Sequence, residues 1–128
     1  MTTIDRPEVE TYARQSRTFL ARSREYLAAG DLHQASEKGW GAAAHMTKAV
    51  AAARGWEYER HRDFTLVLDK VWKLTKNDRV RDVRGSANDL HGYFYERDEF
   101  LDAEAIATDI DRVAELLDLL FPLTELTD

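Results

Sequence analysis

The sequence predicts an all-α protein, an up-down bundle of four to five helices. Its 128 residues include no cysteine, two prolines and six glycines, and good helix formers outnumber the β-branched apolar residues that favour strands. Apolar residues recur at steps of three and four along five segments, which is the period of a helix with one buried face. A chain of this length buries roughly two thirds of its extended surface, so a single domain over residues 1–128 is expected.

The first two helices are expected at about residues 7–29 and 31–54. Asp5 and Asp31 are N-cap candidates, because a short acidic side chain can accept hydrogen bonds from the free N–H groups of the first turn. Gly30 ends the first helix, since glycine adopts the left-handed C′ conformation at little cost. The turn between the two helices is short, which predicts an antiparallel hairpin.

Small residues occupy the middle of the apolar stripe on the second helix, so a neighbouring helix can approach closely there. Three more helices follow a loop at residues 56–61, and they are expected at about 62–76, at 77 or 78 to about 97, and from 102 to the proline at position 122. Asn77 or Asp78 is the cap candidate for the second of these helices, and Asp102 for the third. The fourth helix has a clean apolar seam: Val80, Val83, Ala87, Leu90 and Phe94. The fifth helix is apolar on more than one side, so it is either deeply buried or meets another subunit.

Charge is distributed unevenly along the chain. The segment Arg54–Arg84 has nine bases and six acids, a net charge of +3, whereas the rest has nine bases and 18 acids, a net charge of −9. Non-specific nucleic-acid binders are usually basic, because affinity comes largely from neutralising phosphates, so the chain as a whole is not of that type. Lys76, Arg79 and Arg81 are either a solvated helix face or a local basic strip for an anionic ligand.

Several classes of protein are excluded or disfavoured. The absence of cysteine rules out a disulfide scaffold, a thiolate zinc site and a thiol nucleophile. No apolar run approaches the ~18 residues of a membrane span, and the start lacks the layout of a signal peptide, so a cytoplasmic protein without a membrane segment is expected. None of the four histidines has a carboxylate three positions before it, and no His-x-x-x-His occurs, so no metal or other cofactor is expected.

Arg84 and His91 stand out as a candidate site. Seven residues separate them, so both lie on one side of the fourth helix, at the edge of the buried face and ~10.5 Å apart along the axis. A substrate could bridge them, or two copies of this helix could pack antiparallel and bring each arginine near the other chain's histidine. A histidine can move the proton of a ribose 2′-hydroxyl while an arginine holds the phosphate, which would cleave a phosphodiester without metal.

Each candidate also has a purely structural interpretation. Nearby carboxylates and backbone carbonyls could satisfy Arg84 and His91, and His91 could be an aromatic-layer packing residue beside Tyr95. The loop mixes aromatic and basic residues as base stacking and phosphate contacts require, although its aromatic rings could equally cover the core. That mixed cluster comprises Trp56, Tyr58, Arg60, His61 and Arg62.

The pattern Arg84-x6-His91-x-Tyr93 resembles the R-x(4–6)-H signature of the HEPN superfamily, whose toxin branch carries the same tyrosine. The stretch LAAGDLHQASEKGWGAAAH at residues 27–45 and LHGYFYE at residues 90–96 resemble the archaeal PaREP-type branch of that superfamily. The commoner four-residue gap of the signature would require arginine at position 86, which is a serine here, so only the long-gap version fits.

The resemblance implies a helical bundle that commonly forms a homodimer and, in active members, a metal-independent ribonuclease cleft. By position, Arg84 would bind phosphate, His91 would transfer protons, and Asn88 would be the polar residue often found between them. Tyr93 would match the tyrosine that partner nucleotidyltransferases modify in toxin–antitoxin systems.

Two hypotheses follow. In the first, a HEPN-like homodimer binds or cleaves RNA or nucleotides through Arg84 and His91, with Asn88, Tyr93, Arg81 and His61 as further binding residues. In the second, the chain is a non-catalytic adaptor or dimerisation module that binds a protein partner such as a nucleotidyltransferase.

Overall fold

The computed structural model describes residues 4–125 and contains five α-helices with two short 3₁₀ helices. No strand occurs in this range, so the predicted all-α bundle is confirmed. The elements are α1 (Arg6–Ala28), α2 (Leu32–Arg54), α3 (His61–Thr75), α4 (Asp78–Tyr93), η1 (Asp98–Phe100), α5 (Ala103–Leu120) and η2 (Phe121–Thr124). None of the helices within residues 4–125 is long and apolar enough to cross a membrane.

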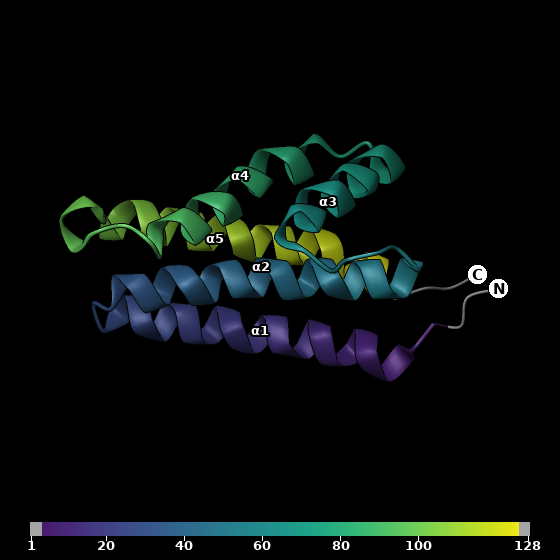
Figure 1. The fold of residues 1–128 in the computed structure, drawn as a ribbon, viewed down its shortest axis with the longest axis horizontal. Coiled ribbons are helices and arrows are strands. Elements are labelled where there is room, and N and C mark those ends of the chain that lie inside the picture. The colour runs from purple at the N-terminus through teal and green to yellow at the C-terminus, as the bar shows by residue number, and fades with distance from the viewer. Residues whose placement is uncertain (1–3, 126–128) are drawn as a thin grey trace.

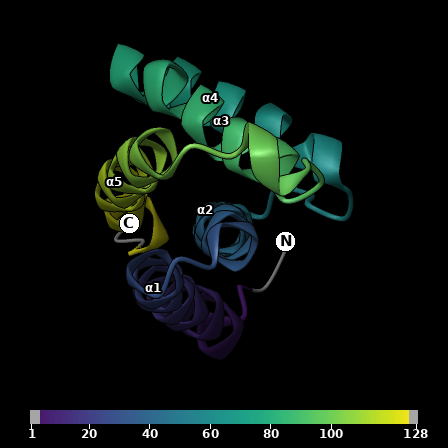
Figure 2. The same cartoon turned by 90° about the vertical axis from the view of Figure 1, so that its left-hand side faces the viewer.

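The helices form two layers. Helices α1, α2 and α5 pack against one another as a three-helix layer, and α3 and α4 lie across α2 and α5 as a second layer (Figures 1 and 2). Successive helices reverse direction except at α2–α3, where the connecting loop runs back along α2. Two contacts show this path of the loop: Tyr58 lies beside Lys48, and His61 lies beside Trp40 near the middle of α2. The return brings the start of α3 to the same level as the end of α4.

Four of the five helices begin at the caps that the sequence predicts. Side-chain oxygens of Asp5, Asp31, Asn77 and Asp102 accept hydrogen bonds from backbone N–H groups of the first turn, at 3.0 to 3.1 Å. Gly30 and Gly55 follow α1 and α2 at φ values of 81° and 71°, a conformation that costs glycine little. Helix α1 thus ends at the predicted turn and pairs with α2 as an antiparallel hairpin.

The contact between α1 and α2 is close because the facing residues are small. Gly39 of α2 has no room for a side chain, because a Cβ atom there would lie 3.2 Å from Ser23 Oγ of α1 and 2.8 Å from Leu90 Cδ1 of α4. The buried hydroxyls of Ser16 and Ser23 each donate to a carbonyl of α2 at 2.6 Å, to Ala42 and Ala35 respectively. The small-residue stripe therefore serves helix packing.

Helix α4 ends at Tyr93, four residues before the predicted position near residue 97. Backbone N–H groups of residues 95 and 96 instead close tight turns onto carbonyls three residues back. A ring nitrogen of His33 lies 2.6 Å from the Glu96 carbonyl oxygen, which ties this turn to the start of α2. Phe94 consequently leaves the buried seam and is only half-buried, whereas the other four seam residues are buried.

Helix α5 is deeply buried within this chain. Leu116, Leu117 and Leu120 are inaccessible to solvent and belong to the main core, together with Ile106 and Ile110. Contacts within the bundle thus account for most of its apolar residues, whereas Leu119 is half-buried and Phe121, which follows the helix, is 38% exposed.

Candidate functional site

His91 belongs to a cluster of rings at the seam between α3 and α4. Its imidazole stacks on that of His61, with ring centroids 4.6 Å apart and planes inclined by 25°. The Trp40 indole of α2 lies 4.7 Å from the His91 ring and 4.8 Å from the His61 ring. Tyr95, which follows α4, meets His91 edge-on at 5.6 Å. We call these four residues the imidazole cluster.

The loop before α3 determines where His61 lies. The Asp63 carboxylate accepts hydrogen bonds from the backbone N–H groups of Glu59 at 2.8 Å and Arg60 at 3.0 Å. These two bonds lower the pKa of Asp63, so it remains ionised and holds the loop against the first turn of α3. As a result α3 begins at His61, one residue earlier than the sequence predicts, and the imidazole lies over the end of α4.

The imidazole cluster contains no carboxylate. Burial lowers the pKa of His91, and the electrostatic effect of the neighbouring His61 imidazole lowers it further. His91 is therefore neutral at pH 7 and able to accept a proton. Within residues 4–125, neither ring of the stacked pair has a hydrogen-bond partner, so their nitrogens are available to a ligand.

Arg84 lies on the same side of α4 and also faces α3. Its Nη1 donates to Asp69 Oδ1 at 2.6 Å, and the two side chains are 23% and 45% exposed. The expectation that a nearby carboxylate could satisfy this arginine is thus met in part, because the other guanidinium nitrogens have no partner among the described residues. Neither Arg84 nor His91 is enclosed in the bundle interior.

Of the further predicted binding residues, His61 joins His91 and Arg81 lies near Arg84. Arg81 and Arg84 line a hollow of about 530 Å³ together with Asp78 and Asp82. Asn88 is exposed between Arg84 and His91 and makes no side-chain hydrogen bond to the described residues.

Tyr93 lies away from these residues. It lines a separate depression among carboxylates, and burial together with Asp109, Asp89 and Asp102 raises the pKa of its hydroxyl. Such an acidic surrounding disfavours phosphate, so the prediction that Tyr93 binds alongside His91 is not supported by its position.

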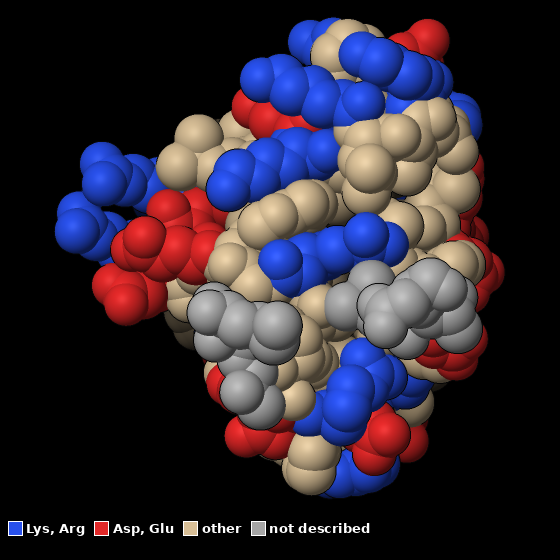
Figure 3. Space-filling model, turned by 90° about the vertical axis from the view of Figure 1, so that its right-hand side faces the viewer, with Lys and Arg blue, Asp and Glu red and all other residues tan. Residues whose placement is uncertain are grey.

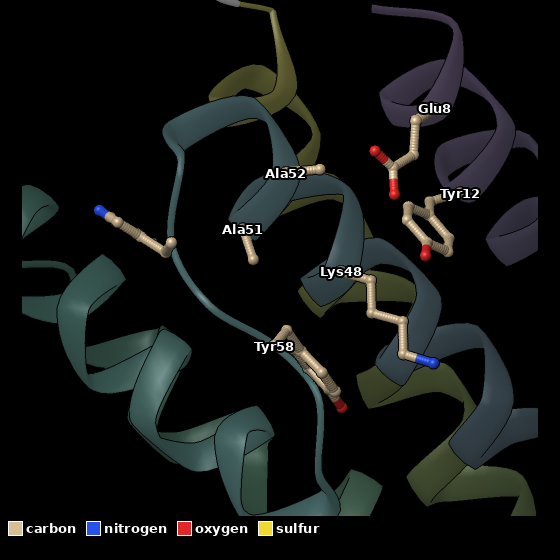
Figure 4. Close-up of a pocket in the computed structure, with 7 residues that line it drawn as sticks. Glu8, Tyr12, Lys48, Ala51, Ala52 and Tyr58 are labelled. Atoms are coloured by element: carbon tan, nitrogen blue, oxygen red, sulfur yellow. The ribbon is translucent and has the colours of Figure 1, made fainter. Parts of the chain in front are cut away.

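A second hollow of about 220 Å³ opens between α1, α2 and the α2–α3 loop (Figure 4). Tyr12 and Glu8 reach it from α1, Lys48 from α2, and Tyr58 from the loop. The Lys48 Nζ lies 5.5 Å from the centre of the Tyr58 ring. Burial, and then the charge of Asp63, raise the pKa of Tyr58 far above its ordinary value, so its hydroxyl remains a hydrogen-bond donor.

No group of three or more histidine, aspartate or glutamate side chains within residues 4–125 is arranged to hold a metal ion. The sequence interpretation missed Trp40 and Asp69, which complete the surroundings of His91 and Arg84. Trp40 lies between two glycines on a small-residue helix, and this isolated large ring was the available signal. No signal in the sequence pointed to Asp69, because its contact with Arg84 depends on how α3 crosses α4.

The sequence matches the archaeal PaREP1/PaREP8 family over residues 11–117. The chain belongs to this family. The match covers all of α2, α3 and α4, so the imidazole cluster and Arg84 lie within the part of the chain that defines PaREP1/PaREP8 proteins. No curated protein matches the sequence.

Proposed function

We propose that this PaREP1/PaREP8 protein binds RNA at the α3–α4 seam and cleaves it without a metal ion. The observation that carries the proposal is the stacked pair His61 and His91, which is open to ligands and bordered by Trp40 and Tyr95. Aromatic rings beside an imidazole pair offer stacking surfaces for bases next to groups that transfer protons. The resemblance of Arg84 and His91 to the HEPN signature supports the same reaction.

The reaction is a transesterification within the RNA. Neutral His91 accepts the proton of a ribose 2′-hydroxyl as the 2′-oxygen forms a bond to the adjacent phosphorus. The bond from phosphorus to the 5′-oxygen breaks, and that oxygen receives a proton from His61 in its protonated form. The products are a 2′,3′-cyclic phosphate and a 5′-hydroxyl, so no water or metal is consumed in this step.

Arg84 is assigned to the phosphate. A guanidinium has five N–H donors, and the single bond to Asp69 leaves others for phosphate oxygens. The ~10.5 Å rise between Arg84 and His91 is too long for both to hold one phosphate in one chain. A homodimer with α4 packed antiparallel against its copy would bring each arginine to the partner's His91, and this homodimer is part of the proposal.

The test is cleavage of a 20-nucleotide RNA in EDTA by the wild type and by His91→Ala, Arg84→Ala and His45→Gln. His45 is the matched control, because it packs between Tyr12 and Phe19 on the α1 side of α2. We expect cleavage to fall by about 10²-fold or more in the first two variants and to be unchanged in the third. Equal cleavage by all four proteins would identify a contaminating nuclease and overturn the proposal.

The second candidate function is a non-catalytic adaptor. Tyr95 and Phe100 are 73% and 65% exposed although they are large and apolar, and both lie in the segment between α4 and α5. Exposed aromatic rings of this kind are common at protein contacts. If a protein partner such as a nucleotidyltransferase binds there, Phe100→Ser should abolish co-purification of a co-expressed partner, while the wild type should show no RNA cleavage.

A further inference from the structure

The end of the bundle that carries the α3–α4 turn is rich in lysine and arginine. Figure 3 views this end, where basic side chains alternate with uncharged ones across the middle and acidic side chains gather mainly toward the edges. Helix α3 and its C-cap contribute Lys70, Lys73 and Lys76 over about 9 Å of helix rise. Within residues 4–125, none of these three lysines forms an ion pair with a carboxylate.

Several of these cations lie over aromatic rings. Lys76 Nζ and Arg81 Cζ lie 4.7 and 4.9 Å from the centre of the Trp72 ring. The Trp72 indole is oriented by a 2.8 Å hydrogen bond from its Nε1 to Asp78. A cation held over a ring face keeps positive charge beside a flat apolar surface.

The same arrangement recurs around the α2–α3 loop. Lys70 Nζ lies 5.4 Å from the centre of the Trp56 ring, and Lys48 Nζ lies 5.5 Å from the centre of the Tyr58 ring. Trp56 and Tyr58 also line the hollow drawn in Figure 4 and are only half-buried. The aromatic–cation strip is the name we give to Trp56, Tyr58 and Trp72 with Lys48, Lys70, Lys76 and Arg81.

We propose that the aromatic–cation strip binds single-stranded nucleic acid. Sequence-tolerant single-strand binding needs cations that contact the phosphates and aromatic rings on which bases stack, and each ring of the strip has at least one cation beside it. An acidic peptide would use the cations but not the rings, so the rings favour a nucleic acid. Most of the strip falls in the segment Arg54–Arg84, whose net charge is +3 in a chain of net charge −6, so the strip would attract a polyanion.

The strip is continuous with the α3–α4 seam. Arg81 belongs to the strip and also lines one hollow with Arg84. A strand held by the strip could therefore extend along α4 toward His91, ten residues and about 15 Å further on. The choice of RNA as the strand rests on the proposed function, whereas the binding surface itself does not require cleavage.

The experiment measures fluorescence anisotropy of labelled 12-nucleotide oligouridine in EDTA, with His91→Ala as the common background to prevent cleavage. Lys70→Glu/Lys76→Glu is compared with Lys38→Glu/Arg22→Glu, which reverses two charges outside the strip. We expect the first pair to weaken binding about tenfold and to reduce the slope of log K against log salt by roughly 1.4, with little change for the second. A labelled oligodeoxythymidine and a labelled polyglutamate are measured in parallel.

Three results would overturn this proposal: no binding of either oligonucleotide, equal weakening by both pairs, or polyglutamate binding as tightly as oligouridine. Retained binding of oligodeoxythymidine would support a strip that reads charge and stacking rather than the 2′-hydroxyl. If the strip variants bind as the wild type does, the cleavage test of His91 still stands. If no cleavage occurs but binding depends on the strip, the binding proposal stands and the cleavage proposal is overturned. Circular dichroism of each variant confirms that it is folded.

Discussion

Between α1 and α2, the hydroxyls of Ser16 and Ser23 are buried and each donates to a carbonyl of the neighbouring helix. Between α3 and α4, the imidazoles of His61 and His91 stack, but within residues 4–125 their nitrogens have no hydrogen-bond partner. Both contacts place polar groups at a helix seam. In the first layer these groups stabilise the fold, whereas in the second they remain available to a ligand.

Several outer charges of the two layers have different partners. Arg17 and Arg24 of α1 reach across to Asp118 and Asp111 of α5, at 3.3 and 2.8 Å. Lys70 and Lys76 of the α3 layer lie over aromatic rings and form no ion pair within residues 4–125, although Arg79 of α4 pairs with Glu115 of α5. Polar groups of the α3–α4 seam that lack internal partners among the described residues remain free to bind a ligand, so substitutions in each layer should separate stability from ligand binding.

The largest expected effect on stability is at Gly39. In Gly39→Val the new Cβ would crowd Leu90 Cδ1 and Ser23 Oγ, so we expect the free energy of unfolding to fall by about 3 kcal/mol. Urea denaturation measures this change, with Gly85→Val as the control because nothing lies within 4 Å of a Cβ there. Equal stability of the two variants would show that α2 packs more loosely against α1 and α4 than described.

Ser16→Ala should have a smaller effect on the same layer. The substitution removes a buried hydrogen bond to the Ala42 carbonyl, so the free energy of unfolding should fall by about 1 kcal/mol without changing oligouridine binding. Thr18→Ala on the exposed face of α1 is the control. If folded Ser16→Ala binds oligouridine more weakly than the wild type, then the α1–α2 layer also contributes to binding, which would contradict the proposed division of roles between the layers.

Asp69→Asn tests the α3–α4 layer and should change ligand binding more than stability. Loss of the carboxylate releases Arg84 from its 2.6 Å ion pair and makes the seam more positive. We expect oligouridine to bind about three times more tightly, with stability lowered by less than about 1 kcal/mol because the pair is partly exposed. Weaker binding in this variant, measured by anisotropy, would mean that Asp69 holds Arg84 in its binding position.

The smallest effect concerns pH. The pKa of His91 is lower in the folded chain than in the unfolded chain, so the unfolded chain binds this proton more readily. Stability is therefore expected to fall as pH decreases through about 6.5, and His91→Gln should reduce that fall. Melting temperatures at pH 7.5 and 5.5 provide the measurement. His45, whose pKa burial also lowers, contributes equally to both proteins. An identical pH dependence would contradict the assigned burial of His91.

The sequence predicted those features that depend on local spacing. The caps at Asp5, Asp31, Asn77 and Asp102 are confirmed because each needs only the next few residues. The predicted end of α4 near residue 97 was wrong, because the turn after Tyr93 is held by a contact between residues 63 positions apart, His33 and the Glu96 carbonyl.

The site divides in the same way. Periodicity placed Arg84 and His91 on one side of a helix, but it could not supply their neighbours. Trp40 and Asp69 reach the site only because the α2–α3 loop runs back along α2 and sets where α3 begins. Tertiary packing decides the path of such a loop, and it produces no periodic pattern in the sequence.

The most direct test of the central claim is a histidine-resolved NMR titration. The ring-proton resonances of His33, His45, His61 and His91 would be followed while 2′-O-methyl oligouridine, which cannot be cleaved by this reaction, is added. An RNA site at the imidazole cluster predicts that the His61 and His91 resonances shift together and saturably, whereas the His45 resonance does not move. Binding that shifts His45 but leaves His61 and His91 unchanged would contradict it.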